Sequence, residues 1–326
     1  ATTTATGCVN TMTGSVTINI DPLPNAYTVM GGGNYCSGGT GVDVNLSNSD
    51  AGVIYQLING AGPVGTALSG SGSSIDFGMQ TVSGIYSVIA TKTTTGCTNA
   101  MGSTVTVGIN PLPTVFTVGG GGNYCAGGAG VHITLSGSNT GITYQLKNGA
   151  TPVGSALPGT GLALDFGSIT GPGTYTVEAT NNTTACVNTM SGTANVVVNP
   201  LPTVYSVAST SSTYCSGGGG VNIWLNNSDA GITYQLYNGS TTVGSALSGT
   251  GSLVNFGYQL AAGSYTVVAR NPATGCTNLM ASGVTIVVNP LPVVYTVTGG
   301  GGYCNGGAGV NIGLSGSNAG VSYQLM

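Results

Sequence analysis

Hydrophobic and polar positions alternate with a period of two along short segments that Gly, Asn and Ser separate. Segment 131–135 alternates Val, Ile and Leu with polar residues, as a half-buried β-strand does. Segment 142–146 has the same pattern, and Asn148-Gly149 after it predicts a two-residue type I′ hairpin turn. No segment shows the 3.6-residue period of an amphipathic helix. The pattern therefore predicts an all-β protein.

The same pattern predicts about seven short strands in each stretch of about 90 residues, which is typical of an immunoglobulin-like β-sandwich. Further strands are expected at 153–157, 162–166, 173–179 and 196–198. The Gly-x-Tyr steps resemble the tyrosine corner of such sandwiches; they end at Tyr86, Tyr175 and Tyr265. The buried tryptophan of antibody domains is absent, and tyrosines stand near its place, at Tyr55, Tyr144 and Tyr234.

A repeat of about 89 residues organises the chain. Pro-Leu-Pro recurs at 22–24, 111–113, 200–202 and 290–292. We therefore expect the C-terminal part of a preceding repeat at 1–21, repeats at 22–110, 111–199 and 200–289, and the N-terminal part of a following repeat at 290–326. Both ends cut through the repeat, which fits either a window onto a longer array or a subunit that its neighbours complete.

The third repeat carries one extra residue between Pro202 and Cys215. There the Gly119–Gly122 tetrad of the second repeat gives way to residues 208–212. A loop absorbs such an insertion, whereas a buried strand would slip register. The tetrad is followed by no Lys and no helix, so it predicts a flexible or bulged crossing and not a phosphate-binding loop.

Charged residues make up only 3% of the chain, against roughly 25% in an ordinary soluble domain. Hydrophobic residues make up 40%, which is enough to fill several small cores and unlike a disordered chain. The three basic residues, Lys92, Lys147 and Arg270, provide no cationic surface for nucleic acid or anionic lipid. No apolar stretch approaches the roughly 18 residues of a membrane helix. Nucleic-acid binding and membrane insertion are therefore not expected.

Several short strings recur in order through the chain: Tyr-Cys-(Ser/Ala/Asn)-Gly-Gly, Gly-(Ile/Val)-x-Tyr-Gln-Leu, Gly-x-Tyr-x-Val and Thr-Gly-Cys-Thr-Asn. Together they resemble the tandem repeats of very large surface proteins of Bacteroidota, such as SprB-type gliding adhesins and other type IX secretion substrates. The resemblance covers the whole chain. It implies export, cell-surface display, and adhesion or scaffolding.

Eight cysteines, two in each repeat, indicate an oxidising compartment and disulfides. The simplest pairing lies within repeats: Cys36–Cys97, Cys125–Cys186 and Cys215–Cys276. Cys8 and Cys304 would then bond to other repeats or other chains. In an immunoglobulin-like sandwich, however, the two loops concerned lie at opposite poles, roughly 30 Å apart. The alternative therefore stays open that Cys36 bonds to Cys186 of the next repeat.

No residue set persists through the repeats as catalysis, a cofactor or a metal would require. His132, the one histidine, has Asp43, Asn222 and Asn311 as its counterparts. Turn residues Asp50 and Asp229 alternate with Asn139 and Asn318, and Asp76 and Asp165 become Asn255. No Cys-x-x-Cys pair or second histidine is present to bind zinc. The chain is therefore predicted not to be an enzyme.

Trp224, the one tryptophan, lies on the outward side of its predicted strand and is a candidate contact to a neighbouring domain or chain. Natural sheets often use charged edges to prevent edge-to-edge pairing, and this chain mostly lacks such charges. We therefore expect an extracellular structural protein that forms a filament, sheath or stalk, with copies of itself or adjacent repeats as partners. The alternative is an adhesin whose repeats or distal head bind polysaccharide, surface glycans or other surfaces.

Overall fold

The computed structural model describes residues 1–326, and every regular element in it is a β-strand. No helix is long and apolar enough to span a membrane. Internal contacts divide the chain into two compact units: residues 1–120, 133–167 and 174–194 form one, and residues 121–132, 168–173 and 195–326 form the other. The first repeat lies wholly in one unit and the third wholly in the other.

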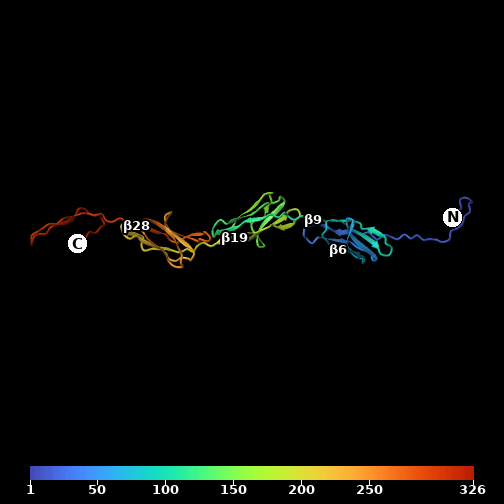
Figure 1. The fold of residues 1–326 in the computed structure, drawn as a ribbon, viewed down its shortest axis with the longest axis horizontal. Helices are drawn as coiled ribbons and strands as arrows, with labels where there is room; N and C mark the ends of the chain where they lie inside the picture. The colour runs from blue at the N-terminus through green and yellow to red at the C-terminus, as the bar shows by residue number, and fades with distance from the viewer. The chain divides into compact units, whose positions relative to one another are not determined.

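The first repeat is a sandwich of two sheets (blue to cyan in Figure 1). Its strands are β1 (Val29–Gly31), β2 (Gly33–Cys36), β3 (Val42–Leu46), β4 (Val53–Asn59), β5 (Gly62–Ser69), β6 (Ile75–Gln80), β7 (Gly84–Lys92), β8 (Thr98–Ala100) and β9 (Val105–Asn110). One sheet has the order β1-β3-β6, and the other has the order β2-β9-β7-β4-β5 with β8 on β7. Only β2 and β9 pair in parallel.

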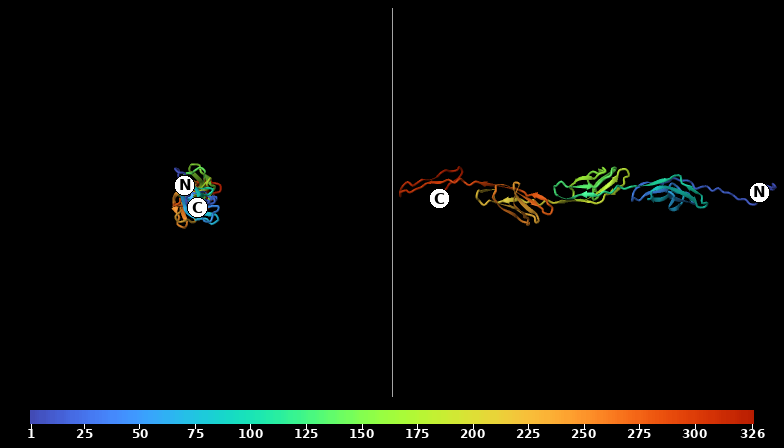
Figure 2. Two further views of the ribbon diagram at one scale, coloured as in Figure 1. Left: turned by 90° about the vertical axis from the view of Figure 1, so that its right-hand side faces the viewer. Right: turned by 45° about the horizontal axis from the view of Figure 1, so that its top comes forward.

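The third repeat has the same topology (yellow to orange in Figure 2). Its strands are β20 (Val207–Ser209), β21 (Thr213–Cys215), β22 (Val221–Leu225), β23 (Thr233–Asn238), β24 (Thr241–Ser248), β25 (Val254–Gln259), β26 (Gly263–Arg270), β27 (Thr277–Leu279) and β28 (Val284–Asn289). The sheets are β20-β22-β25 and β21-β28-β26-β23-β24, with β27 on β26. The chain is thus all-β and consists of tandem immunoglobulin-like sandwich repeats.

The second repeat has its strands in the same order along the chain. They are β10 (Val118–Gly120), β11 (Gly122–Cys125), β12 (Val131–Leu135), β13 (Ile142–Asn148), β14 (Thr151–Pro152), β15 (Leu157–Pro158), β16 (Leu164–Ile169), β17 (Gly173–Asn181), β18 (Val187–Thr189) and β19 (Ala194–Asn199). β13 pairs with β17 in antiparallel register, and β11 runs parallel to β19. The counterpart of β5 is divided here into β14 and β15.

In the first repeat a run of three glycines marks the point where the chain crosses from one sheet to the other. Between β1 and β2, Gly31, Gly32 and Gly33 have φ values of 88°, 71° and 124°. A Cβ on Gly31 would lie 2.2 Å from the Asp43 carbonyl oxygen, so only glycine fits. In the third repeat, residues 210–212 separate β20 from β21, whereas one residue separates β1 from β2. The crossing therefore absorbs the extra residue, as the sequence predicts.

The first and third repeats contain nine strands each, more than the seven that the sequence predicts. The strands that no expected segment covers are short: β1 and β8 have three residues each, and β2 has four. β1 pairs with β3 and β8 with β7, so their strand geometry comes from a neighbour across the sheet. Three residues are too few to show a period-two pattern, which is why the sequence does not reveal them.

Tyrosines form the centre of each core. Tyr55 is completely buried, and its hydroxyl accepts the Asp50 backbone N–H at 2.8 Å. Tyr86 is also buried, and its hydroxyl donates to the Val82 carbonyl at 2.8 Å. The equivalent bond from Tyr265 to the Ala261 carbonyl is 2.9 Å long. These bonds confirm the predicted tyrosine corner for Tyr86 and Tyr265.

The predicted hairpin after β13 forms, but its turn differs from the prediction. Asn148 pairs with Thr151, which leaves Gly149 and Ala150 as the two central residues. Gly149 has a φ of 59°, and Ala150 does not have a positive φ. This pattern belongs to a type II′ turn, not the expected type I′. The asparagine stays in the strand; in the third repeat its counterpart Asn238 donates from Nδ2 to the Ala262 carbonyl at 3.2 Å.

Candidate functional site: disulfides between successive repeats

One cysteine of each repeat ends the strand that lies beside the last strand of the sandwich. Cys36 ends β2 and is opposite Asn110, the residue before the Pro-Leu-Pro linker. The Ser37 N–H donates to the Asn110 carbonyl at 2.9 Å, and the Gly39 N–H donates to the Cys36 carbonyl at 2.9 Å. We call the cysteines at this position the strand cysteines: Cys36, Cys125, Cys215 and Cys304.

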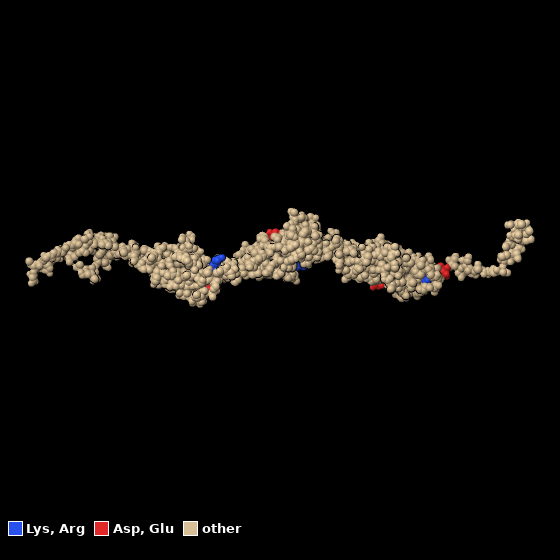
Figure 3. Space-filling view, in the orientation of Figure 1, with Lys and Arg blue, Asp and Glu red and all other residues tan.

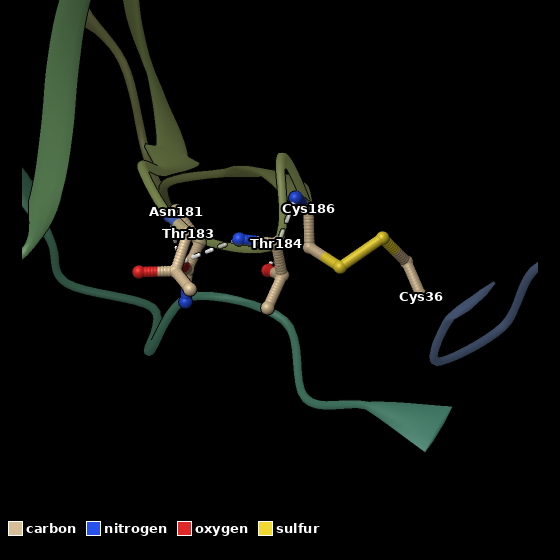
Figure 4. The surroundings of a disulfide bond; sticks show 5 residues. All are labelled: Cys36, Asn181, Thr183, Thr184 and Cys186. Atoms are coloured by element: carbon tan, nitrogen blue, oxygen red, sulfur yellow. Dashed lines mark hydrogen bonds between the residues drawn. A yellow bond between two sulfur atoms is a disulfide. The ribbon is translucent and has the colours of Figure 1, made fainter. Parts of the chain in front are cut away.

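The other cysteine of each repeat lies in a tight hairpin loop, which β17 and β18 flank in the second repeat (Figure 4). The Asn181 N–H donates to the Cys186 carbonyl at 2.8 Å and closes the loop. The Asn181 side chain accepts the backbone N–H groups of Thr183 and Thr184 at 2.9 and 3.2 Å. We call the cysteines at this position the loop cysteines: Cys8, Cys97, Cys186 and Cys276.

Two disulfides join a strand cysteine of one repeat to the loop cysteine of the next. Cys36 bonds to Cys186 with a Cα–Cα distance of 5.5 Å, and Cys125 bonds to Cys276 with a distance of 5.6 Å. Cys186 and Cys276 are completely buried. Figure 4 shows Cys36 reaching the Cys186 loop from a different segment of the chain. Each bridge therefore spans the Pro-Leu-Pro linker between consecutive repeats.

The favoured pairing within repeats, Cys36–Cys97, Cys125–Cys186 and Cys215–Cys276, is wrong, and the inter-repeat alternative is correct. Cys36 lies beside Asn110, where the chain leaves the first repeat. The Cys97 loop lies where the chain enters it, because Asn99 two residues later donates to the Pro24 carbonyl at 2.8 Å. The two cysteines are thus at opposite poles of one sandwich. Four cysteines carry free thiols: Cys8, Cys97, Cys215 and Cys304.

The Pro-Leu-Pro linker is anchored to the repeat that follows it. Asn99 has counterparts in Asn188, which donates to the Pro113 carbonyl at 2.8 Å, and Asn278, which donates to the Pro202 carbonyl at 2.9 Å. These hydrogen bonds from the asparagine side chains hold the last proline of each linker close to the loop that carries the cysteine. An inter-repeat disulfide, here called a staple, therefore connects two backbone segments that are each fixed in a folded sandwich.

Each staple closes a long loop: the bonded cysteines are 150 and 151 residues apart. The chain-entropy model gives about 5 kcal/mol for a loop of this length, as an upper figure for each bond. The two loops overlap between Cys125 and Cys186, so the second repeat belongs to both.

Other candidate residues form local contacts and not a shared site. His132 is exposed on β12. Asp76 and Asn255 accept the backbone N–H of the glycine two residues later, at 2.6 and 2.9 Å. A carboxylate oxygen and an amide oxygen therefore serve equally well as the acceptor at this position. No group of three or more His, Cys, Asp or Glu side chains lies close enough to hold a metal ion. The charged side chains on the visible face are few and scattered (Figure 3).

Sequence reasoning missed one polar contact at the start of the first and third repeats. The Tyr27 hydroxyl donates to Asp50 Oδ1 at 2.6 Å, and the Tyr205 hydroxyl donates to Asp229 Oδ1 at 2.6 Å. These bonds hold the pKa of both carboxyl groups below the usual value. The second repeat has Phe116 and Asn139 at the same positions, a joint exchange that could have revealed the pair. The two positions do not always change together, because the last, partial repeat has Tyr295 with Asn318.

Trp224 lies on β22 between two buried residues, Ile223 and Leu225, and is itself half-buried. Its indole N–H donates to Asn226 Oδ1 at 3.0 Å. The side chain thus faces outward, as expected from the sequence, and contact with another domain or chain stays a prediction.

Comparison with known proteins gives fold-level matches alone. No protein-family model matches the chain, and no curated protein does. Among solved structures, murine CEACAM1b is 16% identical with a TM-score of 0.28, over 53% of this chain and 99% of that one. Eight immunoglobulin domains of Down Syndrome Cell Adhesion Molecule are 13% identical with a TM-score of 0.37, over 90% of this chain and 40% of that one. Fibronectin(III)-like modules of Clostridium thermocellum CbhA are 15% identical with a TM-score of 0.30, over 53% and 95%.

Proposed function

We propose that this chain is a non-enzymatic, secreted structural protein whose disulfide-stapled repeats bear tension in a filament, sheath or stalk at the cell surface. The observation that carries the proposal is the pairing of Cys36 with Cys186 and of Cys125 with Cys276. A disulfide inside a repeat protects that repeat alone. A disulfide between repeats limits how far two consecutive repeats can be drawn apart, which is the property a fibre under tension needs.

The composition supports the same role. Disulfides persist in oxidising, extracellular compartments. The three basic residues leave few sites for trypsin-like proteases, and the near-absence of charge leaves sheet edges without electrostatic protection against association. The resemblance to Bacteroidota surface proteins supports export and display in the same way. These features suit a durable extracellular material made of many like domains.

An adhesin made of binding repeats receives less support from the residues. Such repeats would share an exposed aromatic or acidic cluster, but the counterparts of Trp224 are Asn45, Thr134 and Gly313. Asp50 and Asp229 accept a hydroxyl of their own repeat. The repeats therefore share no residue cluster that would favour the adhesin alternative.

The test is immunogold electron microscopy of native cell-surface material, with antibodies raised against this chain. Label that recurs along ordered filaments or a sheath, with an axial period on the order of 40 Å, is the expected result. Label confined to isolated threads below a distinct head would replace the proposal with an adhesin stalk. Mass spectrometry of the same unreduced material should recover the Cys36–Cys186 and Cys125–Cys276 peptides; thiols at these positions would refute the tension-bearing role.

A further inference from the structure

The larger sheet of the first repeat carries a cluster of isoleucines on its outward face. Outward positions of β4 and β7 alternate with the buried residues of the core. Four of these positions hold isoleucine: Ile54, Ile58, Ile85 and Ile89. Ile85 and Ile89 are 60% and 38% exposed, and the other two are half-buried. We call this cluster the isoleucine face.

The register of the strands brings these side chains together. Ile89 pairs with Gln56, which is midway between the two isoleucines of β4. Both of those isoleucines are therefore diagonal neighbours of Ile89 on the same side of the sheet. Pro63 on β5 pairs with Ile58 and extends the apolar surface on one side. Ala100 on β8 pairs with Ile89 and extends it on the other.

The other two repeats carry different residues at the same positions. In the second repeat the counterparts of Ile58 and Ile89 are an ion pair, in which Lys147 Nζ lies 2.6 Å from Glu178 Oε1. In the third repeat they are Tyr237 and Val268. The counterparts of Ile54 and Ile85 are residues with hydroxyl groups: Thr143, Thr174, Thr233 and Ser264. The isoleucine face is therefore specific to the first repeat.

The fold of the sandwich does not require these isoleucines. Five inward positions of β4 and β7 hold the same residue types in all three repeats. In the first repeat they are at most 1% exposed: Tyr55, Leu57, Tyr86, Val88 and Ala90. The same core therefore forms beneath an ion pair, hydroxyl groups or isoleucines. An exposed apolar cluster that the fold does not need is typical of an interaction site.

The exposure of this face does not depend on which repeats precede or follow it. The second repeat has a repeat before it and a repeat after it in the structure. Thr174, the counterpart of Ile85, is nevertheless exposed there, and the Glu178 side chain is 34% exposed. Consecutive repeats along the chain thus leave this face of the larger sheet open.

We propose that the isoleucine face binds the isoleucine face of a second copy of this chain and so joins two chains side by side. The outward positions of β4 and β7 include no charged residue. The Gln56 side-chain amide already donates from Nε2 to the carbonyls of Leu57 and Val64, at 2.9 and 3.0 Å. An uncharged face whose central amide donates within its own sheet suits an identical face about a two-fold axis.

The size of the face favours a weak contact between many copies. Its sheet has the strand order β2-β9-β7-β4-β5. Strands about 4.8 Å apart, with about six residues each, present a face of about 24 by 20 Å, or about 480 Å². Two copies would bury about 960 Å² together, which is at the low end for specific interfaces. Such a contact becomes effective where many chains lie together, so the inference rests on the proposed structural function and adds the surface through which chains associate.

The test measures association of the oxidised full chain by sedimentation equilibrium over a series of concentrations. The free thiols are first alkylated with iodoacetamide, so that no interchain disulfide can form. We expect a reversible monomer–dimer equilibrium. The variant Ile58→Lys, Ile89→Glu copies the ion pair of the second repeat and should raise the dissociation constant about tenfold or more. The matched control Tyr237→Lys, Val268→Glu places the same pair in the third repeat and should leave the constant unchanged.

A second variant guards against misfolding of the first. Ile54→Thr, Ile85→Thr copies the hydroxyl residues of the second repeat and should weaken the dimer in the same direction. Circular dichroism melts show whether each variant folds as the unsubstituted chain does.

Three results would overturn the inference. They are a chain that stays monomeric at every concentration, a dimer that both folded first-repeat variants leave unchanged, and equal weakening by these variants and the third-repeat control. None of these results affects the tension-bearing role as long as mass spectrometry recovers the Cys36–Cys186 and Cys125–Cys276 peptides. Thiols at those four positions would refute that role whatever the association state.

Discussion

The inter-repeat staples fix how far the chain can be stretched between Cys36 and Cys276. Along the backbone these residues are 240 positions apart (276 − 36). The shortest covalent route instead crosses from Cys36 to Cys186, runs back to Cys125, and crosses to Cys276. Only 61 residues (186 − 125) lie on that route. At roughly 3.4 Å per residue the limits are about 820 Å without the disulfides and about 210 Å with them.

Single-molecule pulling from handles at the two ends of the full chain measures this contour length. Reduction with dithiothreitol should therefore lengthen the fully unfolded chain by about 610 Å. Cys36→Ser leaves one staple and a route of 89 residues, and Cys276→Ser leaves 90, so each should reach about 300 Å between Cys36 and Cys276. Cys97→Ser is the matched control, because Cys97 is free and its loss leaves the 61-residue route unchanged.

Two outcomes would refute this reasoning. A fully extended length that does not change on reduction would mean that no staple spans the repeats. A Cys36→Ser chain with a 118-residue route would mean that the cysteines pair inside repeats, since 89 residues from 36 to 125 and 29 from 186 to 215 would then separate the remaining bonds.

Three further predictions concern single repeats. Ala185 has a φ of 57°, and its counterparts Gly96 and Gly275 have φ values of 74° and 77°. Because a residue with a Cβ is strained at positive φ, Ala185→Gly should raise the free energy of unfolding by about 0.5–1 kcal/mol, and Gly275→Ala should lower it by a similar amount. Denaturant melts of the full chain measure both changes. Tyr86→Phe removes the buried bond to the Val82 carbonyl and should destabilise the first repeat by about 1–2 kcal/mol, whereas Tyr258→Phe, 67% exposed, should change little in the same melts. Tyr27 and Tyr205 lower the pKa of Asp50 and Asp229, so these carboxylates contribute stability that is fully present above their unfolded pKa of about 3.9 and is lost as pH falls through the lowered value. Melts from pH 6 to 2 should show a shallower acid loss for the Asp50→Asn, Asp229→Asn chain, and an unchanged slope would contradict the assignment.

Period-two alternation is a local property, so the sequence predicts the buried faces of β12, β13 and β17 correctly. The repeat spacing also fixes equivalent positions without coordinates. Three features were predictable for this reason: the crossing that absorbs the insertion before Cys215, the tyrosine corner, and the exchange of Asp76 for Asn255.

The sequence by itself determined that the chain is β throughout, repeats every 89 or 90 residues, and carries two cysteines in each repeat. It left the pairing of those cysteines open, because spacing along a chain does not tell which loops share a pole. Only the tertiary structure decided this point. The parallel pairing of β2 with β9 carries Cys36 to the exit of its own repeat, beside the loop of Cys186 and away from Cys97. The reason is physical: a disulfide needs its two Cα atoms within about 7 Å, and only the folded sandwiches set that distance.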